Sequence, residues 1–230
     1  MSRVINLTDA EDDRDHIPLI VDSNTQVPSR IKALIDGTGE DPGPVLAEMA
    51  KRLEANGAEA LAMPCNTAHH YAPVIEAAVR IPLLNMIDLS VERVLASAGK
   101  GAHVGLLASP TALQTRVFDR AFSRAGLATT AIRDQARMLS AVREIKVDST
   151  SMAARNVLRD AAEELARAGS DVLVIGCSEF SIIADAIPGR YTVVDTAEVL
   201  AQSVVSFASG SWAPRVAEIA QPVSPAEPKG

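Results

Sequence analysis

A short stretch of sequence occurs twice in this chain. RLEANGAEALAMPCN in the first half aligns with ELARAGSDVLVIGCS in the second half. In this register Gly57 aligns with Gly169, and the chain's only two cysteines, Cys65 and Cys177, align with each other. An internal repeat indicates a duplicated structural unit. We therefore expect two similar lobes related by a pseudo-twofold axis.

The alignment continues further along both halves after a small change in length. IDLSVERV, which begins at Ile87, then aligns with VDTAEVLA, which begins at Val194, so that Asp88 falls on Asp195. Each of these carboxylates follows a predicted strand. Each is therefore expected to cap the helix that comes next.

Short apolar runs alternate with longer helical patterns along most of the chain. Six runs are predicted to be strands, several of them apolar throughout, as strands buried on both faces of a parallel sheet are: HIPLIVDS, EALAMP, IPLLNMI, HVGLLAS, DVLVIG and RYTVVD. Four segments with apolar residues at three- and four-residue spacing are predicted to be helices: PVLAEMAKRLEANG, YAPVIEAAVR, TALQTRVFDRAFSRAG and SMAARNVLRDAAEELARAG. This alternation predicts an α/β fold with two doubly wound lobes on parallel sheets.

The two predicted lobes begin differently. The second half opens with the strand, loop and helix of HVGLLASPTALQTRVFDRAFSRAG, whereas the first half passes from SRVINLT, which has the pattern of a helix end, directly to HIPLIVDS. The first strand of the N-terminal lobe is therefore expected to be missing. The predicted organisation is an N-terminal lobe over 1–93, a C-terminal lobe over 94–198, a helix over about 199–215 that packs back on the N-terminal lobe, and a proline-rich, disordered tail over 220–230.

Charge and hydropathy argue against two classes of protein. The formal net charge is -7, with 22 Lys and Arg against 29 Asp and Glu, whereas nucleic-acid phosphates require clustered positive charge. No segment approaches the roughly 18 apolar residues of a membrane span, and the N-terminus lacks the pattern of a signal peptide. We expect a cytoplasmic protein that binds neither nucleic acid nor membrane. In that compartment two cysteines are more typical of free thiols than of a disulfide.

Both cysteines follow predicted strands, where open α/β sheets bind their ligands. A helix N-terminus lowers the pKa of a thiol from about 8.5 toward neutrality, so each cysteine is a candidate base. A lone cysteine is more often a buried, inert side chain, but packing does not require two cysteines to occupy one position of a repeat. Across a cleft between lobes, one thiolate could remove a proton from a carbon while the opposite thiol supplies one. The pattern predicts a racemase or epimerase.

The sequence around the cysteines resembles that of a known family. MPCNTAH and GCSE are similar to the paired cysteine motifs of the aspartate/glutamate racemase family, which works without pyridoxal phosphate. Similarity also runs through DHIPLIVDSNTQVPSR, GEDPGPVLAEMAKRLEANGA, IPLLNMI and REIKVD, and it is greatest toward the aspartate racemase branch. The resemblance implies an isomerase that acts on a small acidic amino acid, uses no cofactor or metal, and forms a homodimer.

The resemblance also implies roles for individual residues. Cys65 and Cys177 match the two acid/base cysteines. Arg30 matches an arginine that binds a substrate carboxylate, which suits a planar guanidinium, and Lys146 matches a basic residue on the side of the distal carboxylate. Four further residues are expected to contact the substrate: Asn24, Asn66, Thr67 and Ser178.

Several alternatives stay open on sequence alone. A hydantoin racemase or a maleate-type isomerase could use the same lobes, and a catalytically silent homologue could bind a ligand or dimerise without catalysis. His69 and His70 could orient a thiol or bind a metal, but no second group of ligands has metal-site spacing. We interpret them as ordinary polar residues of a loop or helix. Glu179 could support either Cys177 or the start of its helix.

Overall fold

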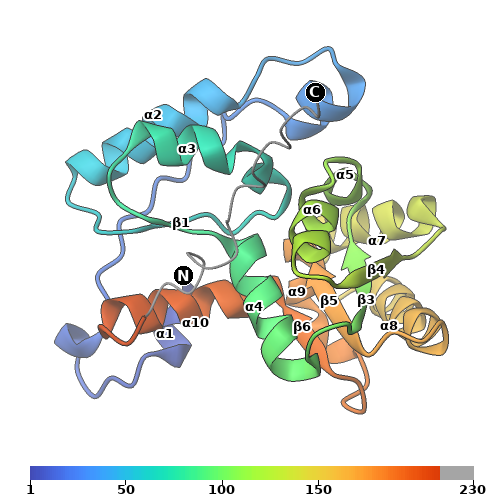
Figure 1. Cartoon of the computed structure of the whole chain (residues 1–230). Helices are drawn as coiled ribbons and strands as arrows, with labels where there is room; N and C mark the ends of the chain where they lie inside the picture. Colours follow the sequence, from blue (N-terminus) through green and yellow to red (C-terminus); the bar gives the residue numbers. More distant parts are fainter. Residues whose placement is uncertain (213–230) are drawn as a thin grey trace, which may run out of the picture.

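The structure is a computed structural model that describes residues 1–212, in which two parallel sheets are connected by helices (Figure 1). A two-stranded sheet belongs to the N-terminal half, and a four-stranded sheet with the order β4-β3-β5-β6 belongs to the C-terminal half. Every strand pairing is parallel, which confirms the predicted α/β fold. The strands are β1 (Leu61–Ala62), β2 (Leu83–Leu84), β3 (His103–Ala108), β4 (Ala128–Ala131), β5 (Val172–Gly176) and β6 (Val193–Asp195).

Ten α-helices lie within residues 1–212: α1 (Ser2–Leu7), α2 (Gly43–Ala55), α3 (Ala72–Ala78), α4 (Met86–Ala98), α5 (Pro110–Gln114), α6 (Val117–Arg124), α7 (Gln135–Val147), α8 (Met152–Arg167), α9 (Ser178–Ile182) and α10 (Thr196–Ala208). Short 3-10 or π segments are η1 (Asp13–Asp15), η2 (Lys32–Asp36), η3 (Thr67–Tyr71) and η4 (Ala184–Ala186). None of the helices in this part of the chain has both the length and the apolar character that crossing a membrane requires.

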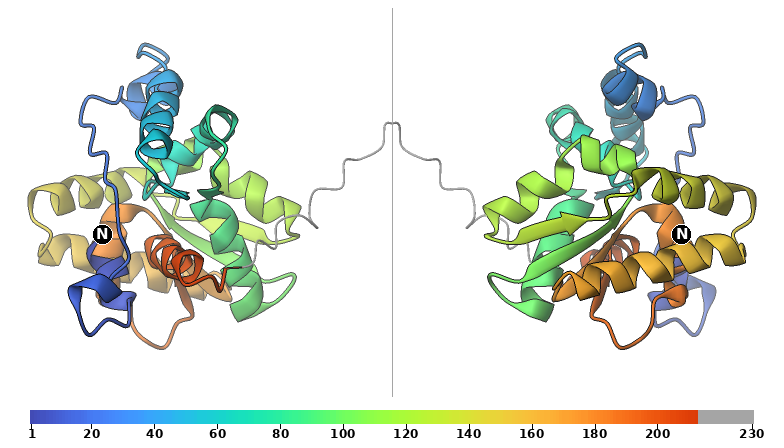
Figure 2. Two further views of the ribbon diagram at one scale, coloured as in Figure 1. Left: turned by 90° about the vertical axis from the view of Figure 1, so that its left-hand side faces the viewer. Right: turned by 90° about the vertical axis from the view of Figure 1, so that its right-hand side faces the viewer.

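The four-stranded sheet is buried on both faces at its centre, because β5 is buried at every position and β3 at all but its first. In β5, Leu173 and Ile175 belong to a core with α7 and α8, whereas Val172 and Val174 belong to a second core with α4 and α6. Successive side chains of a strand point to opposite faces, so VLVIG supplies both cores. Figure 2 shows α7 and α8 on one side of this sheet and α4 to α6 on the other.

The sheet of the N-terminal half is much smaller. Each of its strands has two residues, with Leu61 opposite Leu83. These leucines pack with Ala50 of α2 and with Ala72 and Ile75 of α3 in one small core. Leu84, the next residue of β2, points to the opposite face and packs in a second small cluster.

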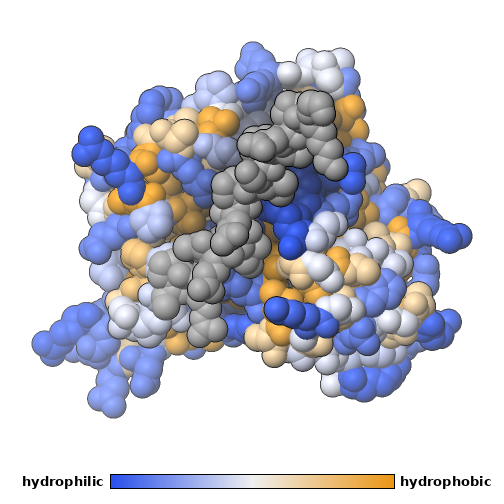
Figure 3. Space-filling view, in the orientation of Figure 1, coloured by the Kyte–Doolittle hydropathy of each residue, from blue (hydrophilic) through white to orange (hydrophobic). Residues whose placement is uncertain are grey.

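The strand expected in HIPLIVDS does not form. Residues 17–24 have no regular structure, and neither β1 nor β2 pairs with them. A strand needs a neighbour to satisfy its N–H and C=O groups. Leu19, Ile20 and Val21 are consequently 39%, 50% and 64% exposed. On the face drawn in Figure 3, apolar side chains are interspersed with polar ones.

Three other elements differ from the sequence prediction. The helix expected in TALQTRVFDRAFSRAG is divided into α5 and α6 at Arg116, the one non-glycine residue with a positive φ (56°) among residues 1–212. β4 and α7 were not predicted: ATTA is too polar to indicate a buried strand, whereas the apolar stripe of QARMLSAVREIKV, which α7 buries, was overlooked.

The repeat is visible in the backbone, but its second section needs a correction. Gly57 and Gly169 both adopt φ of 91°, each in the turn that leads from a helix to a strand. Asp195 caps α10 as predicted, since its side chain accepts from Ala197 N. The cap of α4 is Asn85 and not Asp88. Asn85 is therefore the counterpart of Asp195, three residues from the predicted alignment, because short polar caps are easily confused in sequence.

The last helix connects the two halves. α10 packs along α4 and also against α1. Leu200 of α10 shares a buried cluster with Leu84 of β2 and Met86 of α4, and Phe207 and Trp212 pack against it. The helix expected over about 199–215 begins and ends earlier, at Thr196 and Ala208, with Ser209 as its C-cap. The expected tail over 220–230 lies outside the described residues.

Candidate active site

The two cysteines lie at the carboxyl ends of equivalent strands. Cys177 directly follows β5 and is the N-cap residue of α9. Cys65 follows β1 after two residues, and its N–H donates to Met63 O at 2.8 Å. Both are free thiols; Cys65 is half-buried and Cys177 is buried, with 5% exposure. This is the edge of a parallel sheet where ligands bind.

Two buried hydrogen bonds connect the cysteine loops of the two halves. The side-chain amide of Asn66, which follows Cys65, donates to Thr196 Oγ1 at 3.1 Å. The Thr196 hydroxyl donates in turn to Ile175 O at 2.9 Å, two residues before Cys177. Asn66 and Thr196 are 3% and 1% exposed. The Cys65 loop is therefore anchored to the strand that carries Cys177.

The side-chain oxygen of Asn66 has no such partner. Asn66 Oδ1 is buried, and within residues 1–212 it has no hydrogen-bond partner. A buried polar atom without a partner carries a free-energy cost. This oxygen can accept a hydrogen bond from a bound ligand beside Cys65.

A chain of side chains extends from Cys177 to Lys146. The thiol of Cys177 donates to Glu179 Oε2 at 3.1 Å, and the other carboxylate oxygen, Oε1, lies 3.4 Å from Lys146 Nζ. Ser178 Oγ donates to the same Oε2 atom at 3.2 Å. Lys146 is in the last turn of α7, so the fold brings three of the predicted or considered site residues to Cys177. Glu179 thus supports the thiol directly.

These neighbours determine the protonation of the Cys177 thiol. Burial and the Glu179 carboxylate raise the pKa of Cys177 far above its usual value, and the backbone N–H groups of Phe180 and Glu179 oppose the shift only partly. The expected lowering by the helix start is therefore outweighed here. Burial works against ionisation of Glu179, but hydrogen bonds from Cys177 and its own N–H, with the charge of Lys146, hold the pKa of Glu179 below its usual value. At neutral pH the pair is a thiol and a carboxylate.

His69 supports Cys65 in a different way. His69 Nδ1 lies 2.9 Å from Cys65 O, and the Met86 N–H at the start of α4 donates to His69 Nε2 at 3.0 Å. The side chain is buried, with 5% exposure. The burial and the two hydrogen bonds of His69 correct our interpretation of it, from sequence, as an ordinary polar residue of a loop or helix. His70 is exposed, and its ring contacts the ring of Tyr71 at 5.1 Å between centroids.

The predicted carboxylate ligand Arg30 lies in another part of the N-terminal half. Its Nη1 donates to Pro28 O at 3.2 Å. Its charge acts on Tyr71, where burial and Asp41 raise the pKa of the hydroxyl and Arg30 opposes them. Among the described residues, no hydrogen bond or ion pair links Arg30 to either cysteine.

The remaining predicted ligands divide between the two regions. Asn24 lies near Arg30 in sequence, and its side chain contacts Met49 Sδ at 3.8 Å and accepts from Gln26 N at 2.9 Å. Thr67 is the first residue of η3, and Ser178 is the first residue of α9. Asn66, Thr67 and Ser178 therefore accompany the cysteines, whereas Asn24 does not contact them.

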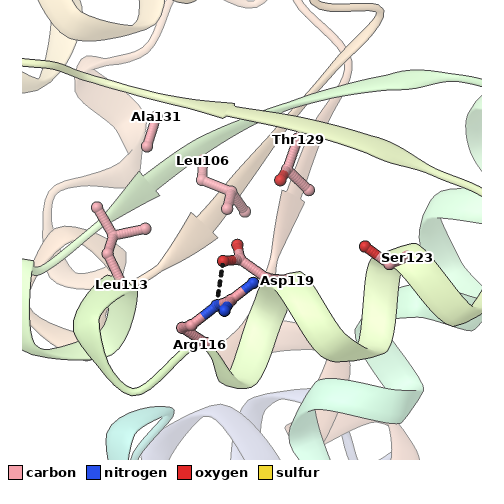
Figure 4. A pocket seen from close by; sticks show the side chains of 7 residues that line it. All are labelled: Leu106, Leu113, Arg116, Asp119, Ser123, Thr129 and Ala131. Carbon is pink, nitrogen blue, oxygen red and sulfur yellow. Dashed lines mark hydrogen bonds and ion pairs between the residues drawn. The ribbon is translucent and has the colours of Figure 1, made fainter.

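Two open cavities lie elsewhere on the described residues. The larger, about 440 Å³, lies between α6 and strands β3 and β4, and Arg116 and Asp119 form an ion pair of 3.4 Å beside it (Figure 4). The other, about 410 Å³, is lined in part by Asp41, His70 and Tyr71. Neither is lined by a cysteine, and no group of His, Cys, Asp and Glu in residues 1–212 is arranged to hold a metal ion. The candidate site therefore rests on the contacts around the cysteines.

Sequence reasoning missed one contributor to this site and set aside another. His69 and Thr196 carry the hydrogen bonds that fix the cysteine loops. Thr196 has no motif of its own, whereas His69 ends the motif MPCNTAH but was interpreted as an ordinary polar residue. A signal was available for His69, because the positions four residues after Cys65 and four residues after Cys177 are both polar in the repeat.

Known proteins resemble the chain along most of its length. The family model described as Asp/Glu/Hydantoin racemase matches residues 1–204. The aspartate racemase of Picrophilus torridus has a similar structure, with a TM-score of 0.77 and 27% identity over 91% of this chain and 87% of that one. A broad specificity amino-acid racemase of Bacillus subtilis is 25% identical over 177 residues, which are 76% of this chain and 70% of that protein.

The likeness extends to a glutamate racemase. That of Deinococcus radiodurans is 30% identical over 156 residues, 66% of this chain. The match spans about half of the relative, 52% of its length. The family model covers nearly all of the residues that the structure describes, and the fold agrees with that of an aspartate racemase. The chain belongs to the Asp/Glu/Hydantoin racemase family.

Proposed function

We propose that this chain is a cofactor-independent amino-acid racemase that inverts the α-carbon of aspartate by proton transfer between Cys65 and Cys177. The observation that carries the proposal is the protonated Cys177 thiol beside Glu179, on a strand anchored to the Cys65 loop through Asn66 and Thr196. The likeness to an aspartate racemase at 27% identity supports aspartate over other amino acids.

The protons and electrons balance without an oxidant or a cofactor. The Cys65 thiolate takes the α-proton, so that an S–H bond forms and the C–H bond breaks with its electron pair left on carbon. The Cys177 thiol then gives its proton to the opposite face of that carbon. Cys65 ends as the thiol and Cys177 as the thiolate, and the reverse reaction exchanges these roles.

Glu179 governs how readily Cys177 changes between these two forms. Its carboxylate accepts the hydrogen bond of the thiol, so it stabilises the protonated state that donates. Lys146 keeps this carboxylate charged from the other side.

Positive charge and N–H groups stabilise the carbanion-like state. The backbone N–H groups at the start of α9 and the charge of Lys146 act from the C-terminal half. Arg30 binds a substrate carboxylate from the N-terminal half, with Asn24 beside it, when the substrate brings the halves together. The unpartnered Asn66 Oδ1 accepts from the substrate ammonium group. Thr67 and Ser178 complete the contacts to the amino acid.

Exchange of the α-hydrogen tests the proposal. The protein is incubated with L-aspartate, and separately with D-aspartate, in deuterated buffer, and NMR and chiral chromatography follow the product. We expect inversion from both enantiomers with deuterium at the α-carbon of the product. Parallel samples with glutamate, a 5-substituted hydantoin and maleate test the other members of the family. Binding of aspartate without exchange would identify a silent homologue and refute the proposal.

The proposal includes a homodimer in the cytoplasm. The apolar side chains of Val147 and Met152, at the end of α7 and the start of α8, are 91% and 67% exposed and could be covered by a second copy. A reducing compartment would keep both cysteines as thiols. Light scattering coupled to gel filtration tests the dimer, and a monomer at micromolar concentration would contradict it.

A further inference from the structure

We propose that His69 is a positioning residue for Cys65: a neutral imidazole, protonated on Nδ1, that fastens the Cys65 loop to the start of α4. The catalytic consequence rests on the proposed function, because it matters only if Cys65 transfers protons. The position of the Cys65 loop and the protonation of the His69 ring do not depend on the proposed function. They can be measured on the protein without substrate.

The two hydrogen bonds of His69 determine its tautomer. The Met86 N–H can only donate, so Nε2 must be the acceptor at 3.0 Å. The proton of the neutral ring is then on Nδ1, where it donates to Cys65 O at 2.9 Å. Both ring nitrogens are used and the ring is buried, so the imidazole has one orientation and one protonation state.

His69 also completes the start of α4. The first N–H groups of a helix have no partner within it. The Asn85 side chain accepts from Ile87 N and Asp88 N. The remaining N–H, that of Met86, is taken by His69. The Cys65 carbonyl is therefore connected to a helix end whose position is fixed by its own core contacts.

The second half of the chain makes the same connection with a different residue. Ser181 stands four residues after Cys177, as His69 stands four residues after Cys65. The Ser181 N–H donates to Cys177 O at 3.1 Å. Its hydroxyl donates to the carboxylate of Asp195, the N-cap of α10, at 2.6 and 2.8 Å. In each half, the fourth residue after the cysteine joins its carbonyl to the start of the helix that follows the next strand.

The two connections differ in their response to acid. A serine hydroxyl does not titrate, whereas protonated His69 would carry a proton on Nε2 and lose its ability to accept from Met86. Burial lowers the pKa of His69, and the Cys65 carbonyl opposes that shift.

Charged groups on the adjoining helices do not reverse the lowering of the His69 pKa. Burial and Asp88 of α4 raise the pKa of Glu76 of α3, burial raises that of Asp88 against the opposing charge of Arg124 of α6, and His70 is exposed. The folded state therefore favours the neutral ring. The stability that His69 contributes is fully present above the unfolded pKa of about 6.5 and is lost as the pH falls below it.

The ¹⁵N spectrum of the imidazoles tests the tautomer directly in the full chain without substrate. We expect one histidine, absent from the spectrum of His69→Asn, to be protonated on Nδ1 alone and to stay neutral below pH 6.5. His70→Asn identifies the neighbouring signal and should leave that of His69 unchanged. An Nε2-protonated His69, or one that titrates near 6.5 as a free imidazole does, would overturn the inference.

Alkylation of Cys65 tests its position without any enzymatic assay. In a Cys177→Ala background, the rate of iodoacetamide labelling of Cys65 should rise when His69 is replaced by Ala and stay unchanged for His70→Ala. His69→Asn keeps a donor for Cys65 O, and it should fall between Ala and the parent. An equal rate in the His69→Ala and His70→Ala proteins, both folded by circular dichroism, would overturn the inference.

The effect on catalysis distinguishes the two proposals. If the parent racemises aspartate, His69→Ala should lower kcat by about 10²-fold, the cost of misplacing a reacting group by about 1 Å, with a smaller change in KM. Unchanged kcat in His69→Ala would overturn the positioning role and leave the racemase intact. A parent without activity refutes the proposed function, and the spectrum and labelling rates still decide the role of His69.

Discussion

The two halves of the molecule share a repeat but support it unequally. Leu173 and its counterpart Leu61 occupy the same position of the repeat, yet Leu173 lies in a four-stranded sheet between two large cores and Leu61 in a two-stranded sheet between two small clusters. The difference shows that the position of a residue in the repeat does not determine how firmly it is held. The extent of the apolar packing around a residue determines how firmly it is held.

The support of the two cysteines differs in the same way. Cys177 is held by a side-chain interaction that acts on its thiol, through Glu179. Cys65 is held through its backbone carbonyl, by His69. One half therefore controls the protonation of its thiol, and the other half controls where its thiol lies.

Removal of either cysteine should have the largest effect and tests whether the halves contribute equally to chemistry. Cys65→Ala and Cys177→Ala should each lower the racemisation rate by about 10²- to 10⁴-fold. The double variant should lose little more, because groups that act as a unit are not additive. Chiral chromatography of aspartate gives the rates. Full activity in Cys65→Ala would show that the C-terminal half works alone.

The paired leucines test the unequal support. Leu173→Ala should lower the free energy of unfolding by about 3 to 5 kcal/mol, since the strand is packed on both faces, and Leu61→Ala by nearer 2 kcal/mol. Urea unfolding at pH 7 gives both values. Equal losses would mean that the small sheet of the N-terminal half is as firmly packed as the large one.

Glu179→Gln sharpens the contrast between the thiols. Removing the carboxylate lowers the pKa of Cys177, so its iodoacetamide labelling at pH 8 should accelerate by about tenfold for each pKa unit lost. Labelling of Cys65 serves as the internal control and should not change. A Cys177 rate that stays at the parent value would show that burial alone sets this pKa.

Asp88 and Glu198 are counterparts on α4 and α10. Replacing either by its amide should have the smallest effect on stability, and the two effects should be of opposite sign. Burial raises the pKa of Asp88 and Arg124 opposes it, so Asp88 stabilises the fold below its unfolded pKa of about 3.9 and this contribution is lost as the pH rises. Asp88→Asn should therefore stabilise the protein at pH 7 but not at pH 3. Glu198→Gln should destabilise it at pH 7, because Glu198 pairs with Arg3 at 3.0 Å.

Both changes should stay below about 1 kcal/mol, because solvent screens partly exposed charges. Thermal unfolding at pH 7 and pH 3 measures them. A destabilised Asp88→Asn protein at pH 7 would contradict the assigned direction.

The sequence predicted the parallel α/β fold and the placement of both cysteines because apolar runs and the repeat are strong local signals. It did not predict that HIPLIVDS lacks a strand neighbour, because pairing depends on other segments. It also placed the α4 cap at Asp88 and not at Asn85, since both residue types cap helices.

The properties of the site were less predictable than its location. The pKa of Cys177 depends on burial and on the rotamer of Glu179, which no spacing in the sequence encodes. The contact between Asn66 and Thr196 joins residues 130 positions apart. Arg3, which binds Ser181, Asp195 and Glu198, has no motif at all.

The contacts of Arg3 have a consequence for how the chain is made. α1 leaves the ribosome long before α10, but every acceptor that Arg3 uses belongs to Ser181, Asp195 or Glu198, up to 195 residues later. Arg3 therefore cannot complete these contacts until α10 has been synthesised. Native contacts between such distant segments slow folding. We therefore expect α1 to be among the last of the described elements to become native.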